Sequence, residues 1–149
     1  MPDRLTGLIA ATYTPLKEDE TLHLAAIEPL TEQLLSDGVA GLYVCGSTGE
    51  GVSMAVAERK QVAEAFIAAA NRRVPVIVHV GHNSLADACD LAQHAQAAGA
   101  DATSAVAPHY FKINDLETLV ACVERVASAA PQLPFYYYHI PVMTGLTLS

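Results

Sequence analysis

The sequence contains no tryptophan, few cysteines and few basic residues. The three cysteines, Cys45, Cys89 and Cys122, include no C-x-x-C pair, and their odd number is typical of reduced thiols in a cytoplasmic protein. Eight Lys and Arg against 16 Asp and Glu give a net charge of −8, which repels phosphate backbones and anionic lipid heads. We therefore expect a cytoplasmic protein with no nucleic-acid partner and no membrane partner.

Long apolar runs are also missing, although the chain as a whole is hydrophobic. No run approaches the roughly 18 apolar residues of a membrane-spanning helix, and Asp3 and Arg4 occupy the place of a secretory signal's apolar stretch. The composition is 52% hydrophobic and only 16% charged, which excludes disorder and favours a buried architecture. At 149 residues, we predict one domain over residues 1–149.

Five short apolar runs, 8–11, 42–45, 76–80, 102–106 and 135–140, alternate with stretches of helical periodicity. Their residues are almost continuously apolar, which is typical of parallel strands buried on both faces. Each run starts about 30 residues after the previous one, the length of a βαβ unit. The sequence therefore predicts an α/β fold of five βα units.

The helical stretches show recognisable ends. The first ends at Gly38, the second covers about 57–70, the third opens at Ser84 and ends at Gly99, and the fourth follows Asn114 or Asp115. Pro29 lies inside the first stretch and indicates a kink there. In the second stretch Val62, Phe66 and Ala69 lie on one side, and the pattern predicts Arg59, Lys60 and Glu64 elsewhere, off that apolar side.

Ligands of parallel α/β proteins bind beyond the carboxyl ends of the strands, so those loops are where chemistry is expected. The run 46–51, G-S-T-G-E-G, follows a strand and precedes a helix, and its N–H groups and hydroxyls can hold an anion. It lacks the lysine of a P-loop and the spacing of the dinucleotide fingerprint. A carboxylate or phosphate site and a plain glycine turn both remain open.

Other candidates at the strand ends are weaker. Tyr136 and Tyr138 share one face of the last strand while Phe135 and Tyr137 share the other, so one pair faces the core, and Tyr138 stands nearest the strand's end. His79 and His82 lack a third ligand at a recognised spacing, and we expect no metal.

Cys45 and the lysines complete the survey of nucleophiles. An apolar setting would leave Cys45 inert, so packing is its favoured role. None of Lys17, Lys60 and Lys112 lies in a predicted strand, where a lysine is desolvated enough to act as a nucleophile.

These residues resemble the family of Schiff-base lyases and synthases that includes N-acetylneuraminate lyase and dihydrodipicolinate synthase. The likeness runs from about residue 7 to the last residue. One motif is the run 41–51, G-L-Y-V-C-G-S-T-G-E-G, followed by Glu58, and the other is Y-H-I-P at 138–141, followed by Thr144 and Gly145.

The resemblance implies a (β/α)8 TIM barrel, of which about the first five βα units are present, that cleaves a keto acid with no cofactor and no metal. Ser47 and Thr48 match the positions that hold the keto acid's carboxylate. Tyr138 matches the tyrosine that shuttles a proton during carbon–carbon cleavage, linked through Ser47 to a second tyrosine from a neighbouring subunit of a homotetramer, which resembles Tyr110.

Two departures qualify that resemblance. Met143 stands where the synthases usually carry an arginine, which favours the branch that cleaves N-acetylneuraminate to pyruvate and N-acetylmannosamine. The family's Schiff-base lysine lies on the sixth strand, about 30 residues past Tyr138, so we expect the isolated chain to be inactive.

Three alternatives follow. One is a related 2-keto acid aldolase or a dihydrodipicolinate synthase-like enzyme. The second is a noncatalytic, five-stranded, flavodoxin-like module that binds an anion. The third is a noncatalytic half-barrel that associates with a copy of itself through its open sheet.

Overall fold

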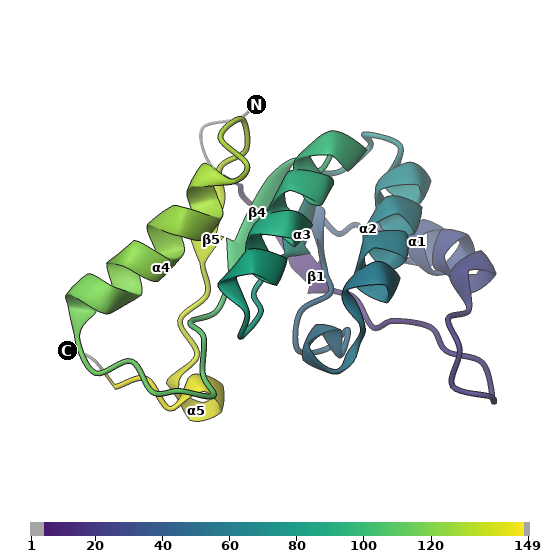
Figure 1. Ribbon diagram of the computed structural model, residues 1–149. Helices are drawn as coiled ribbons and strands as arrows, with labels where there is room; N and C mark the ends of the chain where they lie inside the picture. The colour runs from purple at the N-terminus through teal and green to yellow at the C-terminus, as the bar shows by residue number, and fades with distance from the viewer. Residues whose placement is uncertain (1–4, 148–149) are drawn as a thin grey trace.

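Five strands alternate with helices along the chain in the computed structural model, which describes residues 5–147 (Figure 1). The strands are β1 (Ile9–Ala11), β2 (Gly41–Val44), β3 (Val76–His79), β4 (Ala102–Ala105) and β5 (Phe135–Tyr137). The α-helices are α1 (Ile27–Ser36), α2 (Val56–Ala70), α3 (Leu85–Ala98), α4 (Leu116–Ser128) and α5 (Pro141–Thr144), and short 3₁₀ turns form η1 (Leu24–Ala26) and η2 (Gly51–Ser53). The predicted alternation of strands and helices is confirmed.

The strands pair in chain order, β1-β2-β3-β4-β5, and every pair is parallel. Right-handed crossovers between neighbouring strands place the helices on one side of the sheet, and Figure 1 shows α2, α3 and α4 side by side in one layer. A flavodoxin-like sheet has the order 2-1-3-4-5 and helices on both faces. The flavodoxin-like alternative is therefore wrong, and the observed order is that of a barrel wall.

The main core lies between the helices and the sheet. Leu42 and Val44 of β2 and Val62 and Phe66 of α2 are each fully buried there. Because alternate residues of a strand point to opposite faces, the intervening residue Tyr43 points to the other face of the sheet. That second, concave face carries the cavity described below.

The helix ends follow the predicted capping residues. Ser84 caps α3 by accepting a hydrogen bond from the Asp87 N–H at 3.3 Å, and Gly99 ends that helix with a φ of +90°. Asp115 caps α4. Pro29 lies in the first turn of α1, where a missing N–H costs no helical hydrogen bond, so it helps to start the helix instead of kinking it.

Candidate active site

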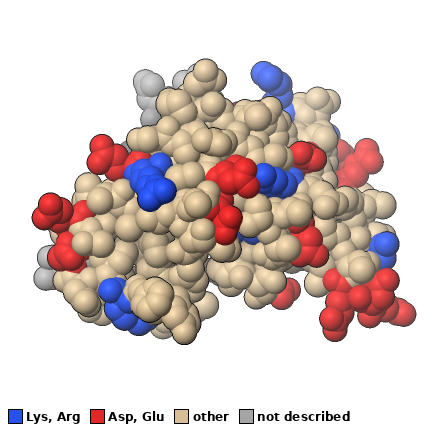
Figure 2. All heavy atoms as spheres, in the orientation of Figure 1, with Lys and Arg blue, Asp and Glu red and all other residues tan. Residues whose placement is uncertain are grey.

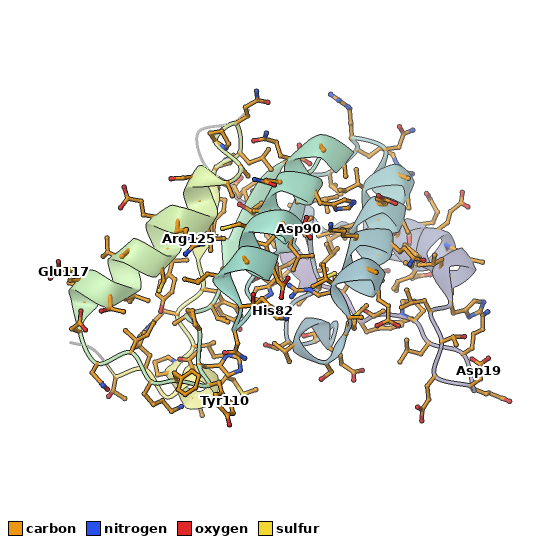
Figure 3. All side chains as sticks on the ribbon, viewed as in Figure 1. Asp19, His82, Asp90, Tyr110, Glu117 and Arg125 are labelled. Carbon is orange, nitrogen blue, oxygen red and sulfur yellow. The ribbon has the colours of Figure 1, made fainter. Side chains whose placement is uncertain are left out.

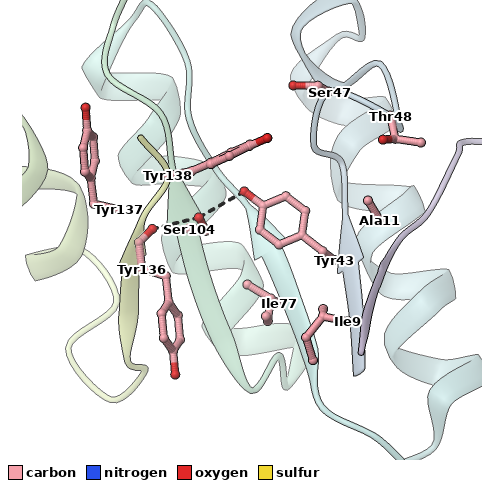
Figure 4. A pocket seen from close by; sticks show the side chains of 10 residues that line it. All are labelled: Ile9, Ala11, Tyr43, Ser47, Thr48, Ile77, Ser104, Tyr136, Tyr137 and Tyr138. Atoms are coloured by element: carbon pink, nitrogen blue, oxygen red, sulfur yellow. Dashed lines mark hydrogen bonds between the residues drawn. The ribbon is translucent and has the colours of Figure 1, made fainter. Parts of the chain in front are cut away.

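A cavity of about 370 Å³ opens on the concave face, beside the carboxyl ends of the strands (Figure 4). Residues of β1, β2, β3, β4 and β5 and of the segments just after β2 and β5 line it: Ile9, Ala11, Tyr43, Ser47, Thr48, Ile77, Ser104, Tyr136, Tyr137 and Tyr138. Ile9, Ala11 and Ile77 give it apolar walls, and the other lining residues carry hydroxyls. The structure thus brings together three of the four predicted site residues, Ser47, Thr48 and Tyr138.

The tyrosines of β5 divide between the two faces of the sheet, as predicted. In Figure 4 the Tyr138 ring points across the mouth of the cavity and the Tyr136 ring points toward the opposite end of that face, whereas the Tyr137 ring lies on the other side of the strand. Tyr137 packs against the small cluster that includes Leu119 of α4, and Phe135 packs against the main core. The N–H of Tyr138 donates to the Ala105 carbonyl at 2.9 Å, so the backbone pairing with β4 fixes Tyr138 just past the end of β5.

The loop after β2 folds back on itself at the rim of the cavity. The Gly51 N–H donates to the Gly46 carbonyl at 3.1 Å, and the Glu50 N–H donates to the Ser47 carbonyl at 3.1 Å. Thr14 holds the loop from the β1 side, because its hydroxyl donates to the Gly49 carbonyl at 2.7 Å. These bonds give the run 46–51 one fixed shape.

That shape leaves donors available for an anion. Within residues 5–147, the amides of Ser47, Thr48 and Gly49 donate no hydrogen bond to another backbone group. The side chains of Ser47 and Thr48 are exposed at the cavity rim, and in Figure 4 the hydroxyls of Ser47 and Tyr138 point toward each other across the cavity mouth. Successive free amides beside two hydroxyls form the kind of concavity that binds a carboxylate or phosphate.

Tyr43 and Ser104 are site residues that the sequence did not single out. The Tyr43 hydroxyl donates to Ser104 Oγ at 3.0 Å, and Ser104 Oγ donates to the Tyr136 carbonyl at 2.7 Å. Burial raises the pKa of Tyr43 to about 12. Tyr43 therefore stays protonated, and its proton is held in the hydrogen bond to Ser104. The Tyr138 hydroxyl has no hydrogen-bond partner in the described part of the chain. Of the two phenols, Tyr138 is therefore the one whose hydroxyl is unbonded among the residues described.

Arg59 overturns a prediction, because its side chain is buried and not on the polar side of α2. Only 1% of its surface is exposed, and its guanidinium donates to the His79 carbonyl at 2.6 Å and to the Gly81 carbonyl at 2.9 Å. No carboxylate pairs with it among the residues described. The reason is its place near the start of α2, beside the carbonyls at the end of β3, which the guanidinium satisfies while its stem covers apolar surface.

Replacing Arg59 by methionine is expected to lower the free energy of unfolding by about 2 kcal/mol. Two buried carbonyls lose their donors, and the removal of a desolvated charge offsets part of that loss. The control is Lys60→Met, which removes the same charge from the next residue, where the ion pair with Asp90 is partly exposed and contributes under about 1 kcal/mol. Urea unfolding measures both, and equal losses would contradict the role given to Arg59.

His79 and His82 do not share a site. His79 is 3% exposed beside Arg59, while the His82 ring accepts a hydrogen bond from the Ser84 N–H at 2.9 Å. Burial lowers the pKa of His79 to about 3, with a further lowering from the Arg59 charge, so this histidine is neutral at physiological pH. In residues 5–147, no group of three or more His, Cys, Asp or Glu side chains is placed to hold a metal ion.

Cys45 has a packing role, as predicted. It is 1% exposed, and burial raises the pKa of its thiol to about 11, so it is a poor nucleophile at neutral pH. Its φ of +58° turns the chain sharply from β2 into the loop. The residue therefore shapes the rim of the cavity without reacting there.

Tyr110 is the predicted site residue that lies outside this cavity. Its side chain is 76% exposed and lies near α5, at the bottom of the view in Figure 3. Its ring contacts Phe111 edge-on, with centroids 5.1 Å apart. Asn83 fixes the backbone here, since its side-chain oxygen accepts from the Tyr110 N–H at 3.0 Å. Tyr110 is therefore not among the residues that line the cavity.

The three lysines are placed elsewhere as well. Lys60 pairs with Asp90 at 2.7 Å on the helical side, and the Lys112 ammonium donates to the carbonyls of His109 and Thr144. Lys17 belongs to the exposed β1–α1 loop. None of them lines the cavity in the part of the chain that the structure describes.

The charged side chains form no basic stripe on the face in view. Figure 2 shows acidic groups spread across that face with a few basic ones between them, and a dense acidic group at lower right, where Figure 3 labels Asp19. In residues 5–147, no helix has the length and apolar character needed to cross a membrane.

The comparisons with known proteins bear on this fold and cavity together. The model of the dihydrodipicolinate synthetase family matches residues 4–149. The chain belongs to this family. The curated relatives of this family member include N-acetylneuraminate lyase A of Xenopus laevis, 50% identical over 146 residues, which are 97% of this chain and 48% of that protein.

Solved structures of the dihydrodipicolinate synthetase family agree with the chain's fold. N-acetylneuraminate lyase of Proteus mirabilis superposes with a TM-score of 0.95 and 40% identity over 98% of this chain and 49% of the other. A catalytic lysine mutant of sialic acid aldolase from Ruminococcus gnavus gives a TM-score of 0.92 and 32% identity over 97% of this chain and 47% of the other. The chain spans about half the length of the relatives it matches, and the predicted partial (β/α)8 barrel is confirmed.

Proposed function

We propose that this chain forms the keto-acid side of the active site of an aldolase-type lyase that cleaves N-acetylneuraminate to pyruvate and N-acetylmannosamine. The observation that carries the proposal is the meeting of Ser47, Thr48 and Tyr138 around one cavity. Its support is the 50% identity to a protein named as an N-acetylneuraminate lyase. Met143, an exposed apolar residue in α5, offers no cation for a second carboxylate and favours this substrate over that of a synthase.

Each side chain has a role that its geometry supports. Ser47 and Thr48, with the free amides around them, bind the carboxylate of the keto acid. Tyr138 stands across the cavity mouth and passes the proton that accompanies cleavage of the carbon–carbon bond, a task that typically accelerates a reaction by 10²–10⁴-fold. A phenol is a weak base and needs a relay for this work, and in this proposal the Ser47 hydroxyl supplies it.

The covalent step of the proposed reaction needs a lysine that these residues do not bring to the cavity. The solved relative from Ruminococcus gnavus is described as a catalytic lysine mutant, so that aldolase has such a residue. We propose that a lysine outside residues 1–149 forms the Schiff base with the keto acid. We also propose that the second tyrosine of the relay is Tyr110 of a neighbouring copy in a homotetramer, because Tyr110 is exposed on its own chain.

A chimera tests this function. The 149 residues are fused to the part of Xenopus laevis N-acetylneuraminate lyase A that they do not span, and pyruvate release from N-acetylneuraminate is measured. We expect activity from the chimera and a fall in kcat of about a hundredfold in its Tyr138→Phe variant, because the proton carrier is lost. The 149-residue chain alone is expected to form no adduct when it is reduced with borohydride in the presence of pyruvate.

The matched control is Tyr137→Phe, which removes the same hydroxyl from the adjacent residue on the opposite face of β5. Its hydroxyl is buried without a partner, so the variant is expected to fold and to keep full activity. A stable pyruvate adduct on the 149-residue chain would overturn the assignment of the lysine. A chimera equally active with Tyr138→Phe would overturn the role of Tyr138.

A further inference from the structure

The hydrogen bonds below the cavity mouth have a fixed direction. The Tyr136 carbonyl has no proton, so Ser104 Oγ, 2.7 Å away, donates to it. A serine hydroxyl has one proton, so Ser104 receives the bond from Tyr43 and does not give one back. The order of donation is therefore Tyr43 to Ser104 to the Tyr136 carbonyl, as the dashed lines in Figure 4 connect them.

This direction determines what the Tyr43 oxygen offers to a ligand. A phenol has one proton and can also accept hydrogen bonds. Because the Tyr43 proton is held by Ser104, which is 1% exposed, only the accepting side of the oxygen remains for the cavity. In the described part of the chain no other group donates to that oxygen, although the Tyr138 ring lies edge-on with centroids 6.0 Å apart.

The Tyr43 ring is also held in place. A Cβ at Gly46 would come within 2.5 Å of a Tyr43 ring carbon, so the missing side chain of Gly46 makes room for the ring. Tyr138 packs against the ring as described, and the hydroxyl is tied to β4 through Ser104. A rigid side chain that can only accept a hydrogen bond discriminates between ligands, because a ligand group that cannot donate to it leaves buried polar atoms unpaired.

We propose that Tyr43 is a specificity-determining residue that accepts a hydrogen bond from a hydroxyl or amino group of the ligand and disfavours a carboxylate at that place. The inference rests on the proposed function in taking the ligand to be a keto acid held at Ser47 and Thr48. It extends that function by giving the chemical class of a substituent that the ligand carries beyond its keto-acid group. Tyr43 thus selects hydroxylated keto acids over those with a second carboxylate.

Binding of two ligand pairs to the full 149-residue chain tests the inference. Hydroxypyruvate is compared with pyruvate, and hydroxyacetone with acetone, by NMR titration. We expect each hydroxylated ligand to bind about three- to tenfold more tightly, as one net hydrogen bond allows. Tyr43→Phe should abolish this preference, whereas the control Tyr136→Phe, another tyrosine that lines the cavity, should keep it.

Ser104→Ala supplies a second test, because it releases the Tyr43 proton. Tyr43 can then donate to a carboxylate, so the affinity for oxaloacetate relative to pyruvate should rise about three- to tenfold. The rise should vanish in the double variant Tyr43→Phe, Ser104→Ala. A merely structural role for Tyr43 would not reverse a preference in this way.

The outcomes separate the two proposals. Tighter binding of pyruvate than of acetone would show that the carboxylate adds affinity, as the proposed function requires. If it does, but the preference for a hydroxyl survives Tyr43→Phe or never occurs, the inference about Tyr43 is overturned and the proposed function stands. If acetone binds as tightly as pyruvate while the preference for a hydroxyl depends on Tyr43, the result supports the inference and contradicts the proposed function. A chain that binds neither hydroxylated ligand overturns the inference.

Discussion

Replacing Gly51 by alanine is expected to lower the free energy of unfolding by about 4 kcal/mol or more and to abolish the anion site. An added Cβ would lie 2.0 Å from the Cys45 carbonyl oxygen and 2.8 Å from its carbon. Both are backbone atoms of the residue that turns β2 into the loop, so the clash is relieved only by opening the loop. Urea unfolding measures the loss, and titration with pyruvate measures the site.

The matched control is Gly38→Ala. Gly38 has a φ of +82° and open space around its Cα, so alanine there meets conformational strain but no clash. We expect a cost of about 1–2 kcal/mol from the left-handed backbone and no change in pyruvate binding. If Gly51→Ala cost no more than Gly38→Ala and kept pyruvate binding, the close approach to Cys45 would not be the reason for the glycine.

The stability of the chain is expected to fall steeply in acid because of His79. Its pKa is about 3 in the folded protein against an ordinary value of 6.5, so the unfolded chain takes up a proton that the folded chain refuses. The stabilisation is complete above pH 6.5 and is lost as the pH falls toward 3. The contribution is about 1.4 kcal/mol per pH unit, or roughly 4 kcal/mol over the interval.

Comparison with His79→Gln isolates this contribution. Exposed carboxyls add to acid sensitivity in the same direction, because hydrogen bonds from Thr21, Arg73 and Thr118 lower the pKa of Asp19, Glu32 and Asp115 respectively. These groups are shared by both proteins, so the difference in slope belongs to His79. The control His139→Gln removes an exposed histidine and is expected to keep the wild-type slope. Equal slopes in all three proteins would contradict a buried, neutral His79.

The backbone plan could be predicted because it depends on patterns within single elements. The almost continuous apolar runs identified all five strands, and Ser84 and Gly99 marked the ends of α3. Ser47, Thr48 and Tyr138 could be placed in one cavity because the carboxyl ends of parallel strands meet at one edge of the sheet.

The contacts that depend on two distant elements escaped prediction. Arg59 looks like a surface residue in the pattern of α2, and only the carbonyls at the end of β3 explain its burial. Tyr43 and Ser104 belong to apolar strands 61 residues apart, and their bond requires both to point to the concave face. One signal was available, since alternation in strands places Tyr43 on the face opposite Leu42 and Val44.

The consecutive order of the strands has a consequence for how the chain folds. Each strand pairs with the strand of the next unit, and α1, α2, α3 and α4 pack in the same succession. Within residues 5–147, the main contacts between elements thus join segments about one βαβ unit apart, and little loop-closure entropy is lost as each unit joins its predecessor. Order can spread along the sheet from a nucleus at β2 and β3, whose neighbours on both sides complete the central core. Substitutions there should slow folding, whereas substitutions at β1 or β5 should mainly speed unfolding.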